Sequence, residues 1–156
     1  MVRSIARIEY LEIMGRVLEL RSEWEQDCLI GLELSVANLS ATGSNNAFAT
    51  ALRGLLTGEG AKLSFACSAG GSRFQKKVWE VAARIGAGET RTYGEVASEI
   101  GCRSPRAVGQ ALKVNPLPII IPCHRVVGRY GRLTGFSCGL EIKRLLLEFE
   151  GTYRTS

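Results

Sequence analysis

The first quarter of the chain alternates hydrophobic and polar residues, which is the pattern of half-buried strands. The alternation is clearest in residues 28–35, weaker in residues 16–20 after the Gly15 turn, and irregular in residues 6–13. We expect the buried face of the third of these strands to carry Cys28, Ile30, Leu32 and Leu34. Residues 62–67 allow one more short strand.

A helix and a linker complete this strand-rich region. Apolar residues recur at helical spacing, and Gly58 follows them as a candidate C-terminal cap. The helix stripe consists of Phe48, Leu52, Leu55 and Leu56. Glycine and serine then concentrate in residues 67–73, which predicts a linker. We therefore divide the chain into residues 1–68 and residues 72–156, with the boundary near 68–71, and expect an α+β protein.

The second part of the chain is predicted to be mainly helical. Ser72 and Gln75 have the spacing of a capping box. The apolar stripe that follows is Phe74, Val78, Val81, Ala82 and Ile85. A last helix is indicated by Ile142, Leu145, Leu146 and Phe149.

Two short helices between these have the pattern of a helix-turn-helix. One is predicted in residues 92–101 and ends at Gly101, and the next begins at Ser104-Pro105, with serine at the N-cap and proline at the first helical position. The core face of the second helix would be Val108, Ala111 and Leu112, and its outer face Arg106, Gly109, Gln110 and Lys113. Many helical hairpins share this pattern, so it needs independent support.

The charge distribution supplies that support. Residues 1–69 hold six Lys/Arg and eight Asp/Glu, whereas residues 70–156 hold fourteen and seven, and no acidic residue occurs between 100 and 140. A one-signed stretch of this length favours a polyanionic partner such as nucleic acid, although a solvated basic face would give the same count.

Three consecutive isoleucines, residues 119–121, predict a buried strand that Pro122 ends. Cys123, His124 and Arg125 follow at once, and His124 is the only histidine of the chain. A thiol becomes a nucleophile as thiolate, which a base and a nearby cation favour. Glu150, on the apolar side of the last helix near its end, is the candidate to orient the histidine, and a solvated glutamate is the alternative.

Other features restrict the class of protein. No apolar run is long enough for a membrane span and no secretion signal is evident, so a cytoplasmic protein without a membrane partner is expected. Five cysteines in a reducing compartment are expected to be free thiols. Cys102 and Cys138 are expected to be small buried apolar residues, and together with Cys123 and His124 they fit no standard zinc spacing.

Residues 72–151 resemble the O6-alkylguanine-DNA alkyltransferases. The resemblance rests on RTYGEVA, on SPRAVGQALKVNPLPIIIPCHRVVG, on LTGFSCGLEIKRLLLEFEG and on FQKKVWEVAARI. It implies a ribonuclease-H-like N-terminal lobe and a helical domain that binds duplex DNA containing O6-alkylguanine or O4-alkylthymine. The implied reaction is base flipping followed by one irreversible alkyl transfer to Cys123, without cofactor or metal, by a monomer whose cooperativity on DNA is left open.

The resemblance also implies residue roles. Cys123 would accept the alkyl group, His124 would be a water-assisted base oriented by Glu150, and Asn115 would order the site. Tyr93 would help to rotate the nucleotide and protonate the departing guanine, while Arg106 would enter the duplex. The remaining DNA contacts would be Ser104, Ala107, Gly109, Gln110 and Lys113, and the substrate pocket would be formed by Val126, Ser137, Cys138 and Gly139.

Two positions depart from the pattern of this family, and two other functions compete. Cys138 stands where glycine is common, so a narrower pocket is expected, and Phe136 replaces a common tyrosine.

A non-catalytic binder of damaged DNA would lack the thiol of Cys123. A cysteine hydrolase built on Cys123, His124 and Glu150 would leave the basic helix pair without a role.

Overall fold

The computed structural model describes residues 4–38, 46–60 and 63–153. Three long antiparallel strands form its N-terminal part: β1 (Ser4–Ile13), β2 (Arg16–Glu25) and β3 (Cys28–Val36). The β1–β2 turn places Met14 and Gly15 at positive φ. The predicted short strand is β4 (Ala66–Cys67), which pairs parallel to β3 and gives the sheet order β1-β2-β3-β4.

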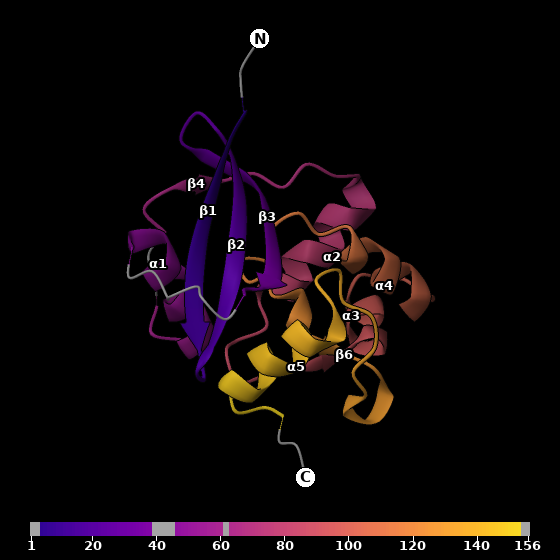
Figure 1. The fold of residues 1–156 in the computed structure, drawn as a ribbon. Helices are drawn as coiled ribbons and strands as arrows, with labels where there is room; N and C mark the ends of the chain where they lie inside the picture. Colours follow the sequence, from indigo (N-terminus) through magenta and orange to yellow (C-terminus); the bar gives the residue numbers. More distant parts are fainter. Residues whose placement is uncertain (1–3, 39–45, 61–62, 154–156) are drawn as a thin grey trace.

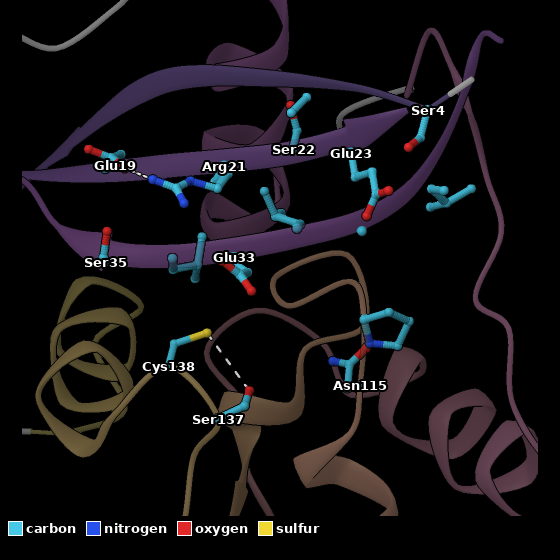
Figure 2. Close-up of a pocket in the computed structure, with 16 residues that line it drawn as sticks. Ser4, Glu19, Arg21, Ser22, Glu23, Glu33, Ser35, Asn115, Ser137 and Cys138 are labelled. Carbon is cyan, nitrogen blue, oxygen red and sulfur yellow. Dashed lines mark hydrogen bonds and ion pairs between the residues drawn. The ribbon is translucent and has the colours of Figure 1, made fainter. Parts of the chain in front are cut away.

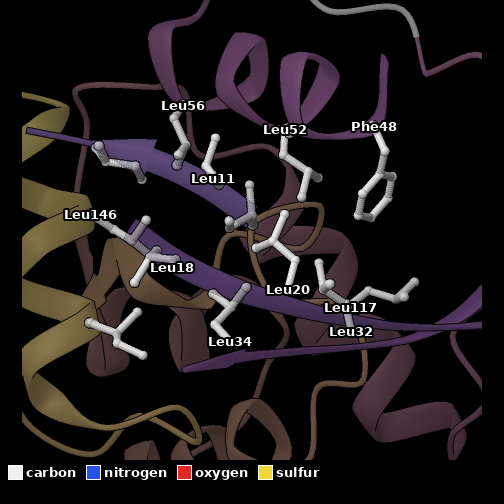
Figure 3. Packing of buried hydrophobic residues seen from close by; sticks show 14 of the residues in the cluster. Leu11, Leu18, Leu20, Leu32, Leu34, Phe48, Leu52, Leu56, Leu117 and Leu146 are labelled. Carbon is white, nitrogen blue, oxygen red and sulfur yellow. The ribbon is translucent and has the colours of Figure 1, made fainter. Parts of the chain in front are cut away.

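Helix α1 (Ala47–Thr57) packs on the inner face of this sheet. Gly58 ends it in the left-handed conformation, as the sequence predicted, and Asn46 caps its N-terminus by accepting from the Ala49 amide, which was not predicted. Figure 3 shows Phe48, Leu52 and Leu56 of α1 directed at strand leucines such as Leu11 and Leu20. Burial of this apolar face is the main favourable term for such a sheet–helix layer.

The buried face of β3 differs from the prediction because of a β-bulge. The β2–β3 register shifts between Glu23 and Trp24, so that Trp24 pairs with Leu29 and Glu23 with Gly31. Ile30 is the extra residue, and an extra residue reverses the alternation on one side of it. The fully buried residues of β3 are therefore Leu29, Leu32 and Leu34, whereas Cys28 and Ile30 are only half-buried.

Four helices follow the linker: α2 (Arg73–Ala83), α3 (Tyr93–Glu99), α4 (Pro105–Lys113) and α5 (Leu140–Phe149). The capping box of Ser72 with Gln75 and the Ser104 N-cap are confirmed, and Thr92 with Glu95 forms a second capping box that was not predicted. The stripe of α2 is buried except for Phe74, which is exposed. In Figure 1 helices α2, α3 and α4 lie together beside the sheet.

The expected strand at residues 119–121 is wrong. Only one isolated bridge, between Pro118 and Ile121, occurs there, and Ile119 turns the chain with a φ of +73°. The physical reason is the local proline content, because Pro116, Pro118 and Pro122 have no amide hydrogen to continue a ladder. The short elements after this turn are the 3₁₀ turns η1 (Cys123–Arg125) and η2 (Arg129–Gly131) and a two-stranded parallel pair, β5 (Arg91–Thr92) with β6 (Val126–Val127).

Two hydrophobic clusters underlie the two regions. The first contains the sheet and α1, and also Leu117, Ile119 and the α5 residues Ile142, Leu145 and Leu146. The second joins α2, α3, α4 and η1, and the Trp79 indole of α2 donates to the Ala111 carbonyl of α4 at 2.9 Å. Helix α5 therefore packs against the sheet although it follows the helical region in sequence. The mixed α+β class is confirmed, with a four-stranded sheet and five α-helices in the described residues.

None of the helices within the described ranges combines the length and the apolar character needed to cross a membrane.

Candidate active site

The thiol of Cys123 is fixed by the turn that precedes it. The Asn115 side chain accepts from the Leu117 amide at 3.0 Å and donates to the Ile121 carbonyl at 2.9 Å, so it braces both ends of the turn. The same amide group of Asn115 donates to Cys123 Sγ at 3.1 Å. Ile119 in the middle of this turn is β-branched with positive φ, a costly conformation that persists only where the surroundings impose it. The structure thus places the Asn115 side chain in contact with the thiol.

Cys123 is held as a neutral thiol in the free protein. It is 3% exposed, and burial raises its pKa to about 11, although the Asn115 hydrogen bond and the positive charge of Lys143 act in the opposite direction. Very little thiolate exists at neutral pH under these conditions. A base must therefore remove the proton when the sulfur reacts.

His124 follows the thiol directly in the chain and is the candidate for that base. Its side chain is fully buried, and its Nε2 lies 3.0 Å from Oε1 of Glu150. Burial lowers the pKa of His124 below its ordinary value even though Glu150 raises it, so the ring is neutral at pH 7. Because Glu150 is an acceptor, Nε2 carries the hydrogen and Nδ1 holds the free lone pair. Nδ1 is buried and has no hydrogen-bond partner in the described part of the chain.

Glu150 is the C-cap of α5, and its fully buried side chain is ionised by its partners. Burial alone would raise its pKa, but hydrogen bonds from His124 and Arg125 outweigh burial, and the pKa lies below the usual range. Arg125 donates from Nη2 to Oε1 at 2.7 Å and from Nε to both oxygens at 3.1 Å. The alternative of a solvated glutamate is excluded.

Arg125 also connects the site to both regions of the fold. Its Nη1 donates to the Ile85 carbonyl just after α2 at 2.7 Å, and its Nη2 donates to the Leu55 carbonyl of α1 at 2.9 Å. All of its nitrogens are therefore used, which satisfies a guanidinium that is almost completely buried.

Lys143 of α5 is a buried charge that the sequence analysis missed. Its ammonium donates to the carbonyls of Val126 at 2.6 Å and Thr134 at 3.1 Å, and lies 3.4 Å from the Tyr93 hydroxyl. Burial lowers its pKa to about 8. Its sequence position gave a signal, since Leu146 and Leu147 lie three and four residues later and are both buried.

A cavity of about 480 Å³ opens beside the thiol. Tyr93 forms part of its wall; its hydroxyl donates to the Thr134 carbonyl at 2.9 Å, and burial raises its pKa. The other lining residues are Pro105, Arg106, Gly109, Gln110, Leu112, Lys113, Cys123, Thr134, Gly135 and Phe136. Arg106, Gln110 and Lys113 are exposed at its rim, so the outer face of α4 and the buried thiol share one opening.

Other predicted residues lie elsewhere. Ser104 caps α4 and Ala107 lies in its first turn, while Val126 is fully buried and offers its carbonyl to Lys143. Ser137 and Cys138 line a second cavity of about 900 Å³ against the strands that carry Glu19 and Glu33 (Figure 2).

Cys138 and Cys102 are half-buried rather than fully buried, and Gly139 precedes α5 with a φ of +93°. Burial is the main cause that raises the pKa of Cys138, and the backbone of Leu34 in β3 hydrogen-bonds to its thiol. The thiol of Cys138 therefore faces β3. Within the described residues, no three His, Cys, Asp or Glu side chains group in a way that could hold a metal ion.

Comparison with known proteins shows which protein family the chain resembles. Residues 73–152 match a family model described as 6-O-methylguanine DNA methyltransferase, DNA binding domain. A relative from Methanosarcina acetivorans, named methylated-DNA–protein-cysteine methyltransferase, is 54% identical over 83 residues, and one of the same name from Mycobacterium leprae is 44% identical over 110 residues. The first match covers 53% of each chain, so this chain spans about half the length of that relative, and the second covers 68% of this chain and 67% of the other.

Two solved structures are similar over most of the chain. Mycobacterium tuberculosis OGT in complex with DNA is 35% identical, with a TM-score of 0.68 over 85% of this chain and 86% of that one. The O6-methylguanine-DNA methyltransferase of Pyrococcus kodakaraensis strain KOD1 is 29% identical, with a TM-score of 0.77 over 94% and 99%.

Glu150→Gln should destabilise the protein. The substitution keeps the shape of the side chain but leaves the buried Arg125 guanidinium without its counter-charge, which costs about 3 kcal/mol of unfolding free energy. Glu141→Gln on the same helix is the control: Glu141 is 63% exposed and its pair with Arg16 is worth less than about 1 kcal/mol. Urea unfolding at pH 7 measures both. Equal losses for the two variants would contradict the account.

The stability difference between wild type and Glu150→Gln should depend on pH. The folded pKa of Glu150 is depressed, so the unfolded chain takes up the proton first as pH falls. The wild type should therefore have its full excess of unfolding free energy above the pKa of Glu150 in the unfolded chain, near 4.5. This excess declines as the pH falls from there through the pKa of Glu150 in the folded protein. Urea unfolding of both proteins between pH 7 and pH 3 tests this, and a constant difference would show that Glu150 is not ionised.

Proposed function

Because the chain belongs to the 6-O-methylguanine DNA methyltransferase family, we propose that it repairs DNA by transferring the alkyl group of O6-alkylguanine, and of O4-alkylthymine, to Cys123. The observation that carries this proposal is a single cavity that is lined both by a buried thiol and by exposed cations. The buried thiol of Cys123, adjacent in sequence to His124 with its partner Glu150, lines this opening, and the exposed cations Arg106 and Lys113 lie at its rim. A cysteine hydrolase would use the thiol but would have no role for the cations.

The proposed transfer begins with loss of the Cys123 proton. A water molecule between Sγ and Nδ1 of His124 would pass the proton to the ring, and Glu150 would stabilise the resulting imidazolium. The sulfur then attacks the alkyl carbon, a carbon–sulfur bond forms and the carbon–O6 bond breaks. Guanine leaves with the electron pair, and Tyr93 is the proposed donor of its proton. The raised pKa of Tyr93 means that this proton is present in the resting site.

Lys143 would support this step from behind the wall of the cavity. Its charge favours the thiolate of Cys123, and its hydrogen bonds to Val126 and Thr134 fix the segments on either side of the opening. Preorganised charge of this kind needs no rearrangement when the sulfur becomes anionic.

DNA recognition is proposed to follow the helix-turn-helix of α3 and α4. An alkylated base in the stack cannot reach a buried thiol, so it must leave the duplex, at a cost of a few kcal/mol. Arg106 at the rim would occupy the gap, and Tyr93 beside Gly109 would help to turn the nucleotide. Further contacts are assigned to Ser104, Ala107, Gln110 and Lys113, which lie on or next to α4.

The roles of Val126, Ser137, Cys138 and Gly139 in the substrate pocket stay proposals based on the resemblance. The thiol of Cys138 faces β3, so it is the backbone of this segment that we assign to the substrate.

The same proposal includes the fold of the N-terminal region, the domain boundary, and the location and oligomeric state of the protein. The N-terminal region is proposed to be ribonuclease-H-like, which is supported by its antiparallel strands, its helix and the short parallel β4. The boundary near 68–71 is supported by the two hydrophobic clusters, with α5 and the turn residues Leu117 and Ile119 as the exceptions. A cytoplasmic monomer that acts on duplex DNA is also proposed.

One turnover per molecule is the expected kinetic outcome. The product is a thioether at Cys123, and neither water nor a second thiol cleaves such a bond readily. Titration of the protein with excess duplex containing O6-methylguanine should therefore give repaired base equal to, and never above, the protein added. Cys123→Ser is the control that should bind the duplex yet form no product. A yield clearly above one per chain would contradict the proposal.

Arg106 and Lys113 should have separable effects. Arg106→Ala removes the group that replaces the extruded base, so the rate with methylated duplex should fall at least about tenfold more than the rate with free O6-benzylguanine. Lys113→Ala should weaken binding to all duplexes and lower the slope of log affinity against log salt by about one. Single-turnover kinetics with both substrates measures the ratio. If Arg106→Ala lowered the reaction rate equally with the methylated duplex and with free O6-benzylguanine, the role of Arg106 would be structural.

A further inference from the structure

The 3₁₀ turn η2 exposes a large aromatic side chain that the proposed mechanism does not use. Tyr130 is 86% exposed, the highest value among the exposed large hydrophobic residues. Its backbone has a φ of 60° and a ψ of 31°, the left-handed region that costs a non-glycine residue about 1–2 kcal/mol. Gly131 follows it, and glycine at position 130 itself would avoid this cost. Such strain is concentrated at residues that contact ligands.

The turn that carries Tyr130 is closed by its own hydrogen bonds. The Gly128 amide donates to the Arg132 carbonyl at 2.7 Å, and the Gly131 amide donates back to the Gly128 carbonyl at 3.1 Å. A Cβ at position 128 would lie 3.0 Å from the Arg132 carbonyl oxygen, so glycine allows this closure without displacing the carbonyl. The aromatic ring is therefore presented by a defined turn rather than by a loose loop.

The surroundings of the ring are cationic. The Arg129 guanidinium lies 5.5 Å from the centroid of the Tyr130 ring, and Arg132 follows two residues later. Neither arginine takes part in an ion pair among the described residues. No acidic residue occurs from 100 to 140 in the sequence. Two unpaired guanidiniums with an exposed aromatic ring form a surface suited to a phosphate-bearing chain.

The turn is placed beside the proposed site. It follows β6, which pairs with β5 at the start of α3, and it is followed by Thr134 and Gly135, which line the cavity of Cys123. In Figure 1 this orange turn projects from the molecule beyond β6. A duplex that lies on α4 and opens toward Cys123 would extend past this turn.

We propose that Arg129, Tyr130 and Arg132 form a second DNA contact, which binds the sugar–phosphate backbone flanking the extruded nucleotide. The two guanidiniums would neutralise phosphates, and the tyrosine ring would pack on the sugar between them. This inference rests on the proposed function, because it takes the duplex held on α4 as its partner.

The test uses undamaged and methylated duplex with full-length variants. Tyr130→Gly should weaken binding of undamaged duplex about threefold to tenfold, since an aromatic contact of this kind is lost. The same substitution should leave the melting temperature unchanged or raise it, because glycine relieves the positive φ. Fluorescence anisotropy and thermal unfolding give the two values. Weaker binding together with a lower melting temperature would assign Tyr130 a structural role and overturn the proposal.

The arginines are tested by salt dependence. Arg129→Gln and Arg132→Gln should each reduce the slope of log affinity against log salt by about one. Each substitution removes one phosphate contact, so about one counterion fewer is released when the DNA binds. Arg21→Gln is the matched control, with the same charge change at a 58% exposed position on the sheet. Slopes that equal the slope of the control would overturn the proposal.

A separate readout distinguishes this inference from the proposed function. The reaction of wild-type Cys123 with free O6-benzylguanine needs no DNA contact, and it fails only if the proposed function is wrong. If that reaction proceeds while the Tyr130 and arginine variants bind DNA as the wild type does, only the second contact is wrong.

Discussion

The structure depends on the buried ion pair between Arg125 and Glu150. Removing two charges from water is costly, and the cost is offset here because the carboxylate accepts from Arg125 and His124 while the guanidinium also serves the Leu55 and Ile85 carbonyls. The pair joins α1, the end of α2 and the end of α5 at one point. It also fixes the orientation of the His124 ring, so the stability of the fold and the orientation of the proposed base depend on the same bonds.

A second buried charge, Lys143, works from the other side of the site. It lies about two helix turns before Glu150, the C-cap of α5, whose apolar residues pack on the sheet. Helix α5 therefore carries both charged groups, while the Asn115 turn carries the thiol. The sheet holds α5 in place through residues such as Leu146, and Leu32 of β3 donates to the Pro116 carbonyl at 2.8 Å, next to the Asn115 turn. This explains why a chain with a small helical catalytic part keeps a strand-rich region of similar size.

Local signals in the sequence predicted most of the fold. The Gly58 C-cap of α1 and the serine N-caps of α2 and α4 were correct because Ser and Gly act within a few residues. His124 and Glu150 were correctly paired because few residues compete for that role. The two errors had different causes: the bulge at Ile30 depends on the neighbouring strand, whereas the turn at Ile119 follows from the nearby prolines and the Asn115 brace, which an apolar run alone does not reveal. Lys143 was missed because its carbonyl partners come from segments that only the fold brings together.

The most direct test of the account is the mass of the intact protein after reaction with duplex DNA containing O6-methylguanine, followed by peptide mapping. The account predicts that the protein gains one methylene, that the gain maps to Cys123, and that the residue then no longer reacts with thiol reagents. An unchanged mass with repaired DNA, or a methylene on Cys138 or another cysteine, would contradict the assignment of Cys123 as the acceptor.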